Sequence, residues 1–311
     1  MKLRTRGISG TRNQAESERE RAHRVIARKA AAEGIVLLEN NGVLPLKKGS
    51  NVALYGGGAR HTIKGGTGSG SVNNRSNVSI DEGLRNAGFT VTTDAWLDAY
   101  DAAYEQSYEE WKDYIYEISE PGNFDSLYRA HASHPMQMPK GSAITKTEAA
   151  DAIYVISRIS GEGADRKAEP GDYYLSEQEE EELKAITECY DNTIVILNVG
   201  GVMDVSFLEK YNIAALVMLS QAGMEGGNAL ADVLSGAVTP SGKLTDTWGC
   251  HYEDYPSSAT FSHNNGNIIE EKYYEGIYVG YRYFDSFEVE PRYPFGYGMS
   301  YTTFDVATEN A

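Results

Sequence analysis

Short apolar runs that are rich in β-branched residues alternate along most of the chain with charged, helix-favouring segments. Apolar runs of this length, bounded by turn residues, predict buried strands. The predicted strands cover residues 51–58, 89–93, 152–160, 193–200 and 213–219. The predicted helices cover residues 14–34, 79–88, 97–118, 176–190, 204–211 and 225–236. This alternation indicates an α/β fold, a mostly parallel sheet sandwiched between helices, of the flavodoxin or Rossmann type.

Capping signals support several of these helices. Ser79 is followed three residues later by Glu82, which is a capping box, and Ser176 is a second N-cap. Gly34 is a stop signal for the first helix. Residues 119–147 have only weak periodicity, so we expect an excursion from the regular pattern there.

The pattern changes past residue 240, where Gly, Pro and Tyr become frequent and predict extended loops and edge strands. We therefore expect three parts. Residues 1–24 form a polar lead-in with the start of a helix, and residues 25–250 form the α/β sandwich. Residues 251–311 form a Gly/Tyr-rich exit segment, which ends where an all-β module would begin.

Composition and charge limit which binding partners and which cellular compartment we expect for this chain. The chain has 311 residues and a formal net charge of -17, so nucleic acid and anionic membranes are poor partners. Its two cysteines form no disulfide framework and no CxxC motif, which fits a reducing compartment. The polar start lacks the apolar core of a signal peptide, and no run is long enough to span a membrane. We expect a cytoplasmic protein.

A glycine-rich loop follows the first predicted strand. Seven glycines lie between Gly56 and Gly70, and the spacing lacks the third glycine and the immediate helix of a dinucleotide site. Two interpretations remain open. The loop lends backbone N–H groups and Ser69 to a polar, uncharged ligand, or it is a bare connector.

Glu162 stands between two glycines just beyond an apolar strand, where open α/β proteins bind ligands. Asp165 and Arg166 follow and could tune its pKa or hold the loop by ion pairs. A surface loop with incidental charges is an equally good interpretation of the spacing. His131 and His134 have no third ligand nearby, so we expect no metal and no cofactor.

Seven motifs then occur in an order that resembles the α/β-sandwich domain of family 3 glycoside hydrolases, of the β-glucosidase and β-xylosidase type. They are RKAAAEGIVLLENNGVLPL, GGTGSG, SRISGEGADRK, ILNVGGVMDV, GMEGGNALADVLSGAVTPSGKLTDTW, YYEGIYVGYRYFD and YPFGYGMSYTTF. The resemblance covers roughly residues 25–304 and is weakest over residues 94–150.

The resemblance implies a retaining β-glycosidase that removes terminal β-D-glucosyl residues from a carbohydrate substrate. It places the general acid/base on Glu162, the lining of the sugar site on Ser69, Thr67 and Lys64, and a loop-fixing role on Asp165 and Arg166. In the family, the aspartate nucleophile lies on a (β/α)8 barrel, which we do not find in this chain.

We therefore expect the sandwich to be placed first, as in family members of reversed domain order, with a fibronectin-like module next and the barrel in cis or in trans. The isolated chain is then expected to be inactive. The alternatives are a non-catalytic sugar-binding or scaffold domain, β-xylosidase specificity in the full enzyme, and a nucleotide-binding Rossmann protein. An uncovered barrel-facing surface could also drive homo-oligomer formation.

Overall fold

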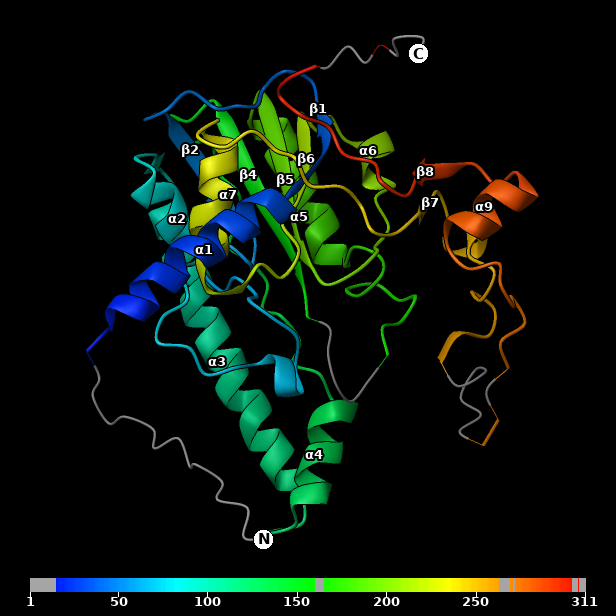
Figure 1. Ribbon diagram of the computed structural model, residues 1–311. Coiled ribbons are helices and arrows are strands. Elements are labelled where there is room, and N and C mark those ends of the chain that lie inside the picture. The colour runs from blue at the N-terminus through cyan, green and yellow to red at the C-terminus, as the bar shows by residue number, and fades with distance from the viewer. Residues whose placement is uncertain (1–14, 160–164, 263–268, 271, 304–306, 308–311) are drawn as a thin grey trace, which may run out of the picture.

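A computed structural model of the protein describes residues 15–159, 165–262, 269–270, 272–303 and 307 (Figure 1). Its core is a six-stranded sheet with the strand order β1-β6-β5-β4-β2-β3. The strands are β1 (Val36–Asn40), β2 (Asn51–Tyr55), β3 (Thr90–Val91), β4 (Asp151–Arg158), β5 (Asn192–Val199) and β6 (Ala215–Met218). All neighbours are parallel except β1, which runs antiparallel to β6 at one edge. The predicted mostly parallel α/β sandwich is confirmed.

The parallel strands have the flavodoxin order, which reverses its direction between β2 and β4. The central strands β4 and β5 are buried on both faces because helices cover both sides of the sheet. Their sequences are therefore apolar without alternation, as over Ile153–Ile156 and Ile194–Leu197. In such folds, ligands bind outside the carboxyl ends of the strands at the point where the strand order reverses.

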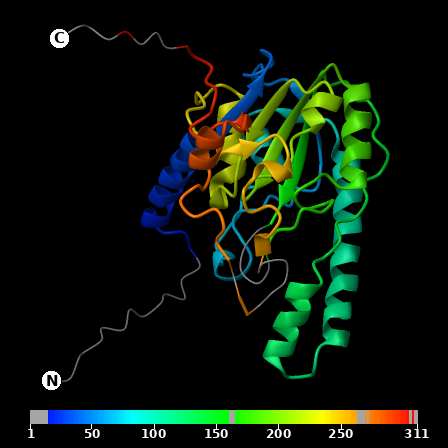
Figure 2. The same ribbon diagram turned by 90° about the vertical axis from the view of Figure 1, so that its right-hand side faces the viewer.

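Helices form a layer on each side of the sheet (Figures 1 and 2). One layer contains α1 (Glu18–Gly34), α2 (Ile80–Asn86) and α7 (Gly226–Leu234), and the other contains α3 (Asp94–Ile118) and α5 (Glu177–Cys189). The short α6 (Phe207–Lys210) precedes β6. The capping box expected at Ser79 and the N-cap expected at Ser176 are both present, and Ser176 also forms a capping box, with Glu179. The sequence therefore sets the starts of α2 and α5 locally.

Residues 119–147 contain a helix that the sequence pattern did not predict. The helix α4 (Phe124–Ser133) is N-capped by Asn123, whose side chain accepts from the Ser126 N–H. It packs against the distal half of α3, and the two helices project well beyond the edge of the sheet (Figure 1). The excursion is thus partly an ordered helical hairpin.

Strand β3 is shorter than the predicted run 89–93. The backbone pairing with β2 ends at Thr92, whose N–H donates to Val52 O at 3.0 Å. The Thr93 side chain then replaces it, because its Oγ1 donates to Leu54 O at 2.7 Å and accepts from Leu54 N at 2.9 Å. The chain can then turn directly into α3 at Asp94.

The region past residue 240 contains the antiparallel strands β7 (Trp248–Gly249) and β8 (Pro291–Tyr293), in line with the edge strands expected there. Between them lies an unpredicted helix, α9 (Tyr281–Phe287), which buries Phe284. Aromatic residues favour strands, so the sequence pattern pointed away from a helix. The last residue of β8, Tyr293, contacts the sandwich by donating to Glu39 on β1 at 2.7 Å.

Candidate active site

The glycine loop starts at the carboxyl end of β2 and lies directly against β4. Gly56 has a φ of +94°, and a Cβ there would come within 2.3 Å of Val155 O. A Cβ on Gly58 would come within 1.9 Å of Ser157 Oγ. Only glycine allows this close approach. The run Gly56–Gly58 therefore crosses β4 a few residues before the chain reaches Glu162.

A buried amide on β5 joins two loops of this edge. The Asn198 side chain is fully buried, and its Oδ1 accepts from Ile63 N at 2.7 Å. Its Nδ2 donates to Ile63 O at 2.9 Å and to Ser220 O at 2.7 Å. The sequence interpretation missed Asn198, although an Asn inside the apolar run 193–200 is a usable signal. It fixes the glycine loop relative to the end of β6.

The three expected sugar-site residues Lys64, Thr67 and Ser69 lie together in the glycine loop. Lys64 Nζ donates to Val72 O at 2.7 Å and also to the Asn74 side chain, so its ammonium closes the loop on itself. Thr67 precedes the 3₁₀ turn η1 (Gly68–Gly70), which contains the exposed Ser69. Hydroxyl groups are thus presented near the tip of this loop.

Glu162 belongs to residues 160–164, which lie outside the described part of the chain. The strand before it is firmly held at its end. Arg158 is buried and donates to both carboxylate oxygens of Glu179, at 2.7 and 2.6 Å. The same guanidinium donates to the Asp172 and Tyr174 carbonyls. The end of β4 at Arg158 is therefore fixed by a charged cluster.

Arg166 lies at the centre of the loop that follows. It donates from Nε to Asp172 Oδ1 at 2.6 Å and from Nη1 to Val202 O at 2.7 Å. Its ion pair is thus made with Asp172, a partner that the sequence interpretation did not name. Asp165 instead accepts a hydrogen bond from Ser262 Oγ at 2.8 Å. The two residues tie the loop to the turn after β5 and to the exit segment.

Aromatic residues of the exit segment cover this loop. The rings of Tyr173 and Tyr252 make an edge contact with centroids 5.2 Å apart. Burial raises the pKa of the Tyr255 phenol to about 12 and raises that of Tyr173 as well. Both phenols are neutral at physiological pH, so they act as packing and hydrogen-bonding groups.

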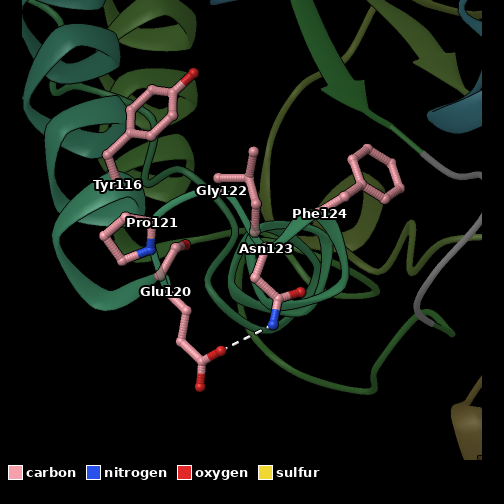
Figure 3. A pocket seen from close by; sticks show the side chains of 8 residues that line it. Tyr116, Glu120, Pro121, Gly122, Asn123 and Phe124 are labelled. Carbon is pink, nitrogen blue, oxygen red and sulfur yellow. Dashed lines mark hydrogen bonds between the residues drawn. The ribbon is translucent and has the colours of Figure 1, made fainter.

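A hollow of about 270 Å³ lies at the turn between α3 and α4, at the far end of the helical hairpin (Figure 3). It is lined by Tyr116, Ser119, Glu120, Pro121, Gly122, Asn123, Phe124 and Leu127. It does not coincide with the strand ends. Across the described ranges, no helix combines the length and the hydropathy that crossing a bilayer requires.

The fold is an α/β domain of flavodoxin strand order, with the strand-order switch between β2 and β4, where open sheets of this kind generally bind ligands. The family model described as the glycosyl hydrolase family 3 C-terminal domain matches residues 35–301. The chain therefore belongs to glycosyl hydrolase family 3, and the resemblance seen in the sequence motifs is confirmed.

Similar proteins include Beta-glucosidase A of Butyrivibrio fibrisolvens, which is 37% identical over 309 residues, covering 91% of this chain and 35% of the relative. A Beta-glucosidase of Ruminococcus albus is also 37% identical, covering 89% of this chain and 28% of the relative. The structure of beta-glucosidase 3B from Thermotoga neapolitana in complex with alpha-D-glucose has a TM-score of 0.72 and 36% identity. That match covers 93% of this chain and 39% of the other. The chain thus spans well under half the length of these relatives.

Proposed function

We propose that this chain supplies the general acid/base, Glu162, to a retaining β-glucosidase that hydrolyses terminal β-D-glucosyl residues. The observation that carries the proposal is topological. The end of β4, four residues before Glu162, and the glycine loop after β2 meet where the strand order reverses. The similar chains are named as β-glucosidases, which favours glucosides over xylosides as substrates.

The chemistry requires a second carboxylate from outside this chain. In a retaining glycosidase, the nucleophile and the acid/base flank the scissile bond at about 5–5.5 Å from each other. Glu162 would protonate the leaving oxygen and then deprotonate the attacking water. We assign the nucleophile to a (β/α)8 barrel, in cis or in trans, so the isolated chain should not turn over substrate.

The described residues around Glu162 would position the sugar and the loop. Ser69 and Thr67 offer hydroxyl groups to the substrate. Lys64 is assigned to the shape of the glycine loop rather than to direct sugar contact, because its ammonium is engaged by Val72 O and Asn74. Arg166 would hold the Glu162 loop through Asp172 and Val202, and Asp165 would link it to Ser262.

The test compares two variants in a full-length enzyme that contains this chain. Glu162→Gln should slow turnover of cellobiose by about 10²–10⁴-fold, because a positioned general acid contributes that much. An aryl glucoside with an activated leaving group needs less protonation and should lose less. Glu169→Gln is the matched control, because Glu169 is an exposed glutamate in the same stretch. Equal cellobiose rates for Glu162→Gln and wild type would refute the assignment.

A non-catalytic sugar-binding domain is the second candidate. The observation behind it is the glycine loop, where Thr67 and the exposed Ser69 place two hydroxyl groups near the tip. Calorimetric titration of the isolated chain with glucose separates the two candidates. Saturable binding without the rest of an enzyme supports the binding domain, whereas half of a shared active site should bind glucose too weakly to saturate.

A further inference from the structure

Two aromatic side chains of α4 are exposed to solvent at the free end of the helical hairpin. Phe124 and Tyr128 are one turn apart on α4 and therefore share a face. Their rings are nearly parallel, at 26°, with centroids 6.4 Å apart. The residues are 76% and 44% exposed. Large apolar side chains left in water at neighbouring positions are typical of binding surfaces, and we call this pair the aromatic platform.

The base of the helical hairpin is held against the glycine loop by hydrogen bonds and a ring contact. Arg60, which follows the glycine run, donates to Asp98 at 2.7 Å and to Asp101 at 2.9 Å on α3. The His61 ring stacks on Tyr104 with centroids 3.8 Å apart. From Tyr104, α3 continues to Ile118, which is about 20 Å at 1.5 Å per residue. The α3 helix therefore holds the platform at a fixed distance from the glycine loop.

The platform is on the side of α4 that faces away from α3 and toward the strand ends (Figures 2 and 3). Figure 2 shows α4 between α3 and the loops that follow the strands. In Figure 3, Phe124 lies on the side of α4 that faces away from α3, whereas Tyr116 stands on α3 itself. A ligand that extends outward from the strand ends would therefore reach Phe124 before it reached Tyr116.

The charge of this region disfavours an anionic occupant. Between Asp94 and His134 the chain carries ten Asp or Glu residues against one Lys and one Arg. Such a surface repels nucleic acid, anionic lipid and phosphate groups. The apolar C–H faces of pyranose rings pack on aromatic rings, and their hydroxyl groups remain in water or bond to polar neighbours. Glu120 and Asn123, which are hydrogen-bonded to each other at 2.8 Å, offer such groups beside the platform.

We propose that the aromatic platform binds the leaving-group end of a linear oligosaccharide, several sugar units from the bond that is cleaved. The proposal rests on the proposed function, because the placement of the cleaved bond near the strand ends gives the substrate its direction. It makes the chain one half of a site that prefers extended oligosaccharides over disaccharides and aryl glucosides.

Calorimetric titration and saturation-transfer NMR of this 311-residue chain with a linear β-1,4-glucose hexamer test the proposal. The double variant Phe124→Ala/Tyr128→Ala should weaken binding of the hexamer at least about tenfold, since exposed aromatic anchors dominate such contacts. Tyr116→Ala removes a ring of similar exposure, 62%, from the other helix and should leave binding unchanged. Circular dichroism verifies that each variant is folded.

Three results would overturn the proposal. The wild-type chain fails to bind the hexamer, or Tyr116→Ala weakens binding as much as the double variant does. In the third, the double variant abolishes self-association in sedimentation experiments and leaves hexamer binding intact, so that the platform is an interface between copies of the chain.

Kinetics in the full-length enzyme separate this proposal from the assignment of Glu162. The double variant should lower kcat/KM for the hexamer about tenfold, with cellobiose and an aryl glucoside unaffected. Glu162→Gln should impair cellobiose hydrolysis whatever the platform does. Failure of the double variant alone overturns the platform, and failure of Glu162→Gln alone overturns the proposed function.

Discussion

Asn198 holds two loops of the candidate site with one buried amide. Replacing it with Leu, which has a similar volume, would leave Ile63 N, Ile63 O and Ser220 O without their partner. Each buried polar group left unsatisfied costs about 1–3 kcal/mol, so we expect Asn198→Leu to lower the free energy of unfolding by about 3 kcal/mol. Urea denaturation measures the change.

Asn192→Leu is the control for this prediction. Asn192 lies on the same strand but is only half-buried, and its amide donates one hydrogen bond to Asp151 at 2.8 Å. Its loss should cost less than about 1 kcal/mol. Equal destabilisation by the two variants would show that the buried amide has no special role in fixing the loops.

Glu182 and Glu181 are neighbours on α5 with opposite pKa shifts. Burial raises the pKa of Glu182, in spite of hydrogen bonds from Gln178, Tyr154 and Gly141, whereas a hydrogen bond from Lys140 lowers the pKa of the exposed Glu181. The stability contributed by Glu182 is complete below its ordinary pKa of 4.5 and is lost as the pH rises through the raised value. The stability contributed by Glu181 is present at neutral pH and is lost on acidification.

We therefore expect Glu182→Gln to gain stability relative to wild type as the pH rises from 4 to 7. Glu181→Gln should show a smaller trend of the opposite sign, because its ion pair is exposed to solvent. Urea unfolding at several pH values measures both slopes. Slopes of the same sign would contradict the assigned burial of Glu182.

At the residue scale, the sequence indicated which loops the candidate site residues lie in, but not the contacts that these residues make. Lys64 is in the expected loop, but its engagement by Val72 and Asn74 depends on how the loop folds back. The pairing of Arg166 with Asp172 likewise depends on a turn six residues away. Asn198 was detectable from its own strand, since a polar side chain in an apolar run needs a buried partner.

At the element scale, the close contact between the glycine run and β4 gives a direct test. A Cβ on Gly56 would meet the Val155 backbone, which cannot move aside, and the φ of +94° disfavours any L side chain. We expect Gly56→Ala to lower the free energy of unfolding by about 3 kcal/mol, combining overpacking with backbone strain. Thermal and urea unfolding measure this loss.

Gly70→Ala serves as the matched control within the same loop. No atom lies within 4 Å of a Cβ at Gly70, so the change should stay within about 0.5 kcal/mol. If Gly56→Ala were as harmless as Gly70→Ala, the glycine run would not pack on β4 as described.

The predicted strands and helices of the sandwich are confirmed because their signals are local, namely apolar runs and capping residues. Other features are set by tertiary pairing. The direction of β1 depends on its antiparallel register with β6, which no local pattern encodes. The aromatic residues of α9 favour strands, yet its Phe284 is buried in a helix that begins after Gly280, which has a φ of +58°. Non-local packing therefore decides these elements.

At the scale of the whole molecule, the exit segment links the Glu162 loop to the rest of the fold. Ser262 bonds to Asp165, Tyr252 packs on Tyr173, and Tyr293 returns to Glu39 on β1. The residues that follow β4 thus have partners in the exit segment and, through Arg166, at Val202 after β5. These contacts would support the position of the proton donor proposed above.

The most direct test of this account uses Glu162→Gln in the full-length enzyme with an activated aryl β-glucoside and sodium azide. Azide is a nucleophile that needs no general base, so it should release the glucosyl-enzyme that the variant hydrolyses slowly. We expect azide to accelerate turnover of the variant, but not of Glu169→Gln, and to yield β-glucosyl azide with retained configuration. A Glu162→Gln enzyme that hydrolyses cellobiose at the wild-type rate and forms no glucosyl azide would contradict the role of Glu162 as the acid/base.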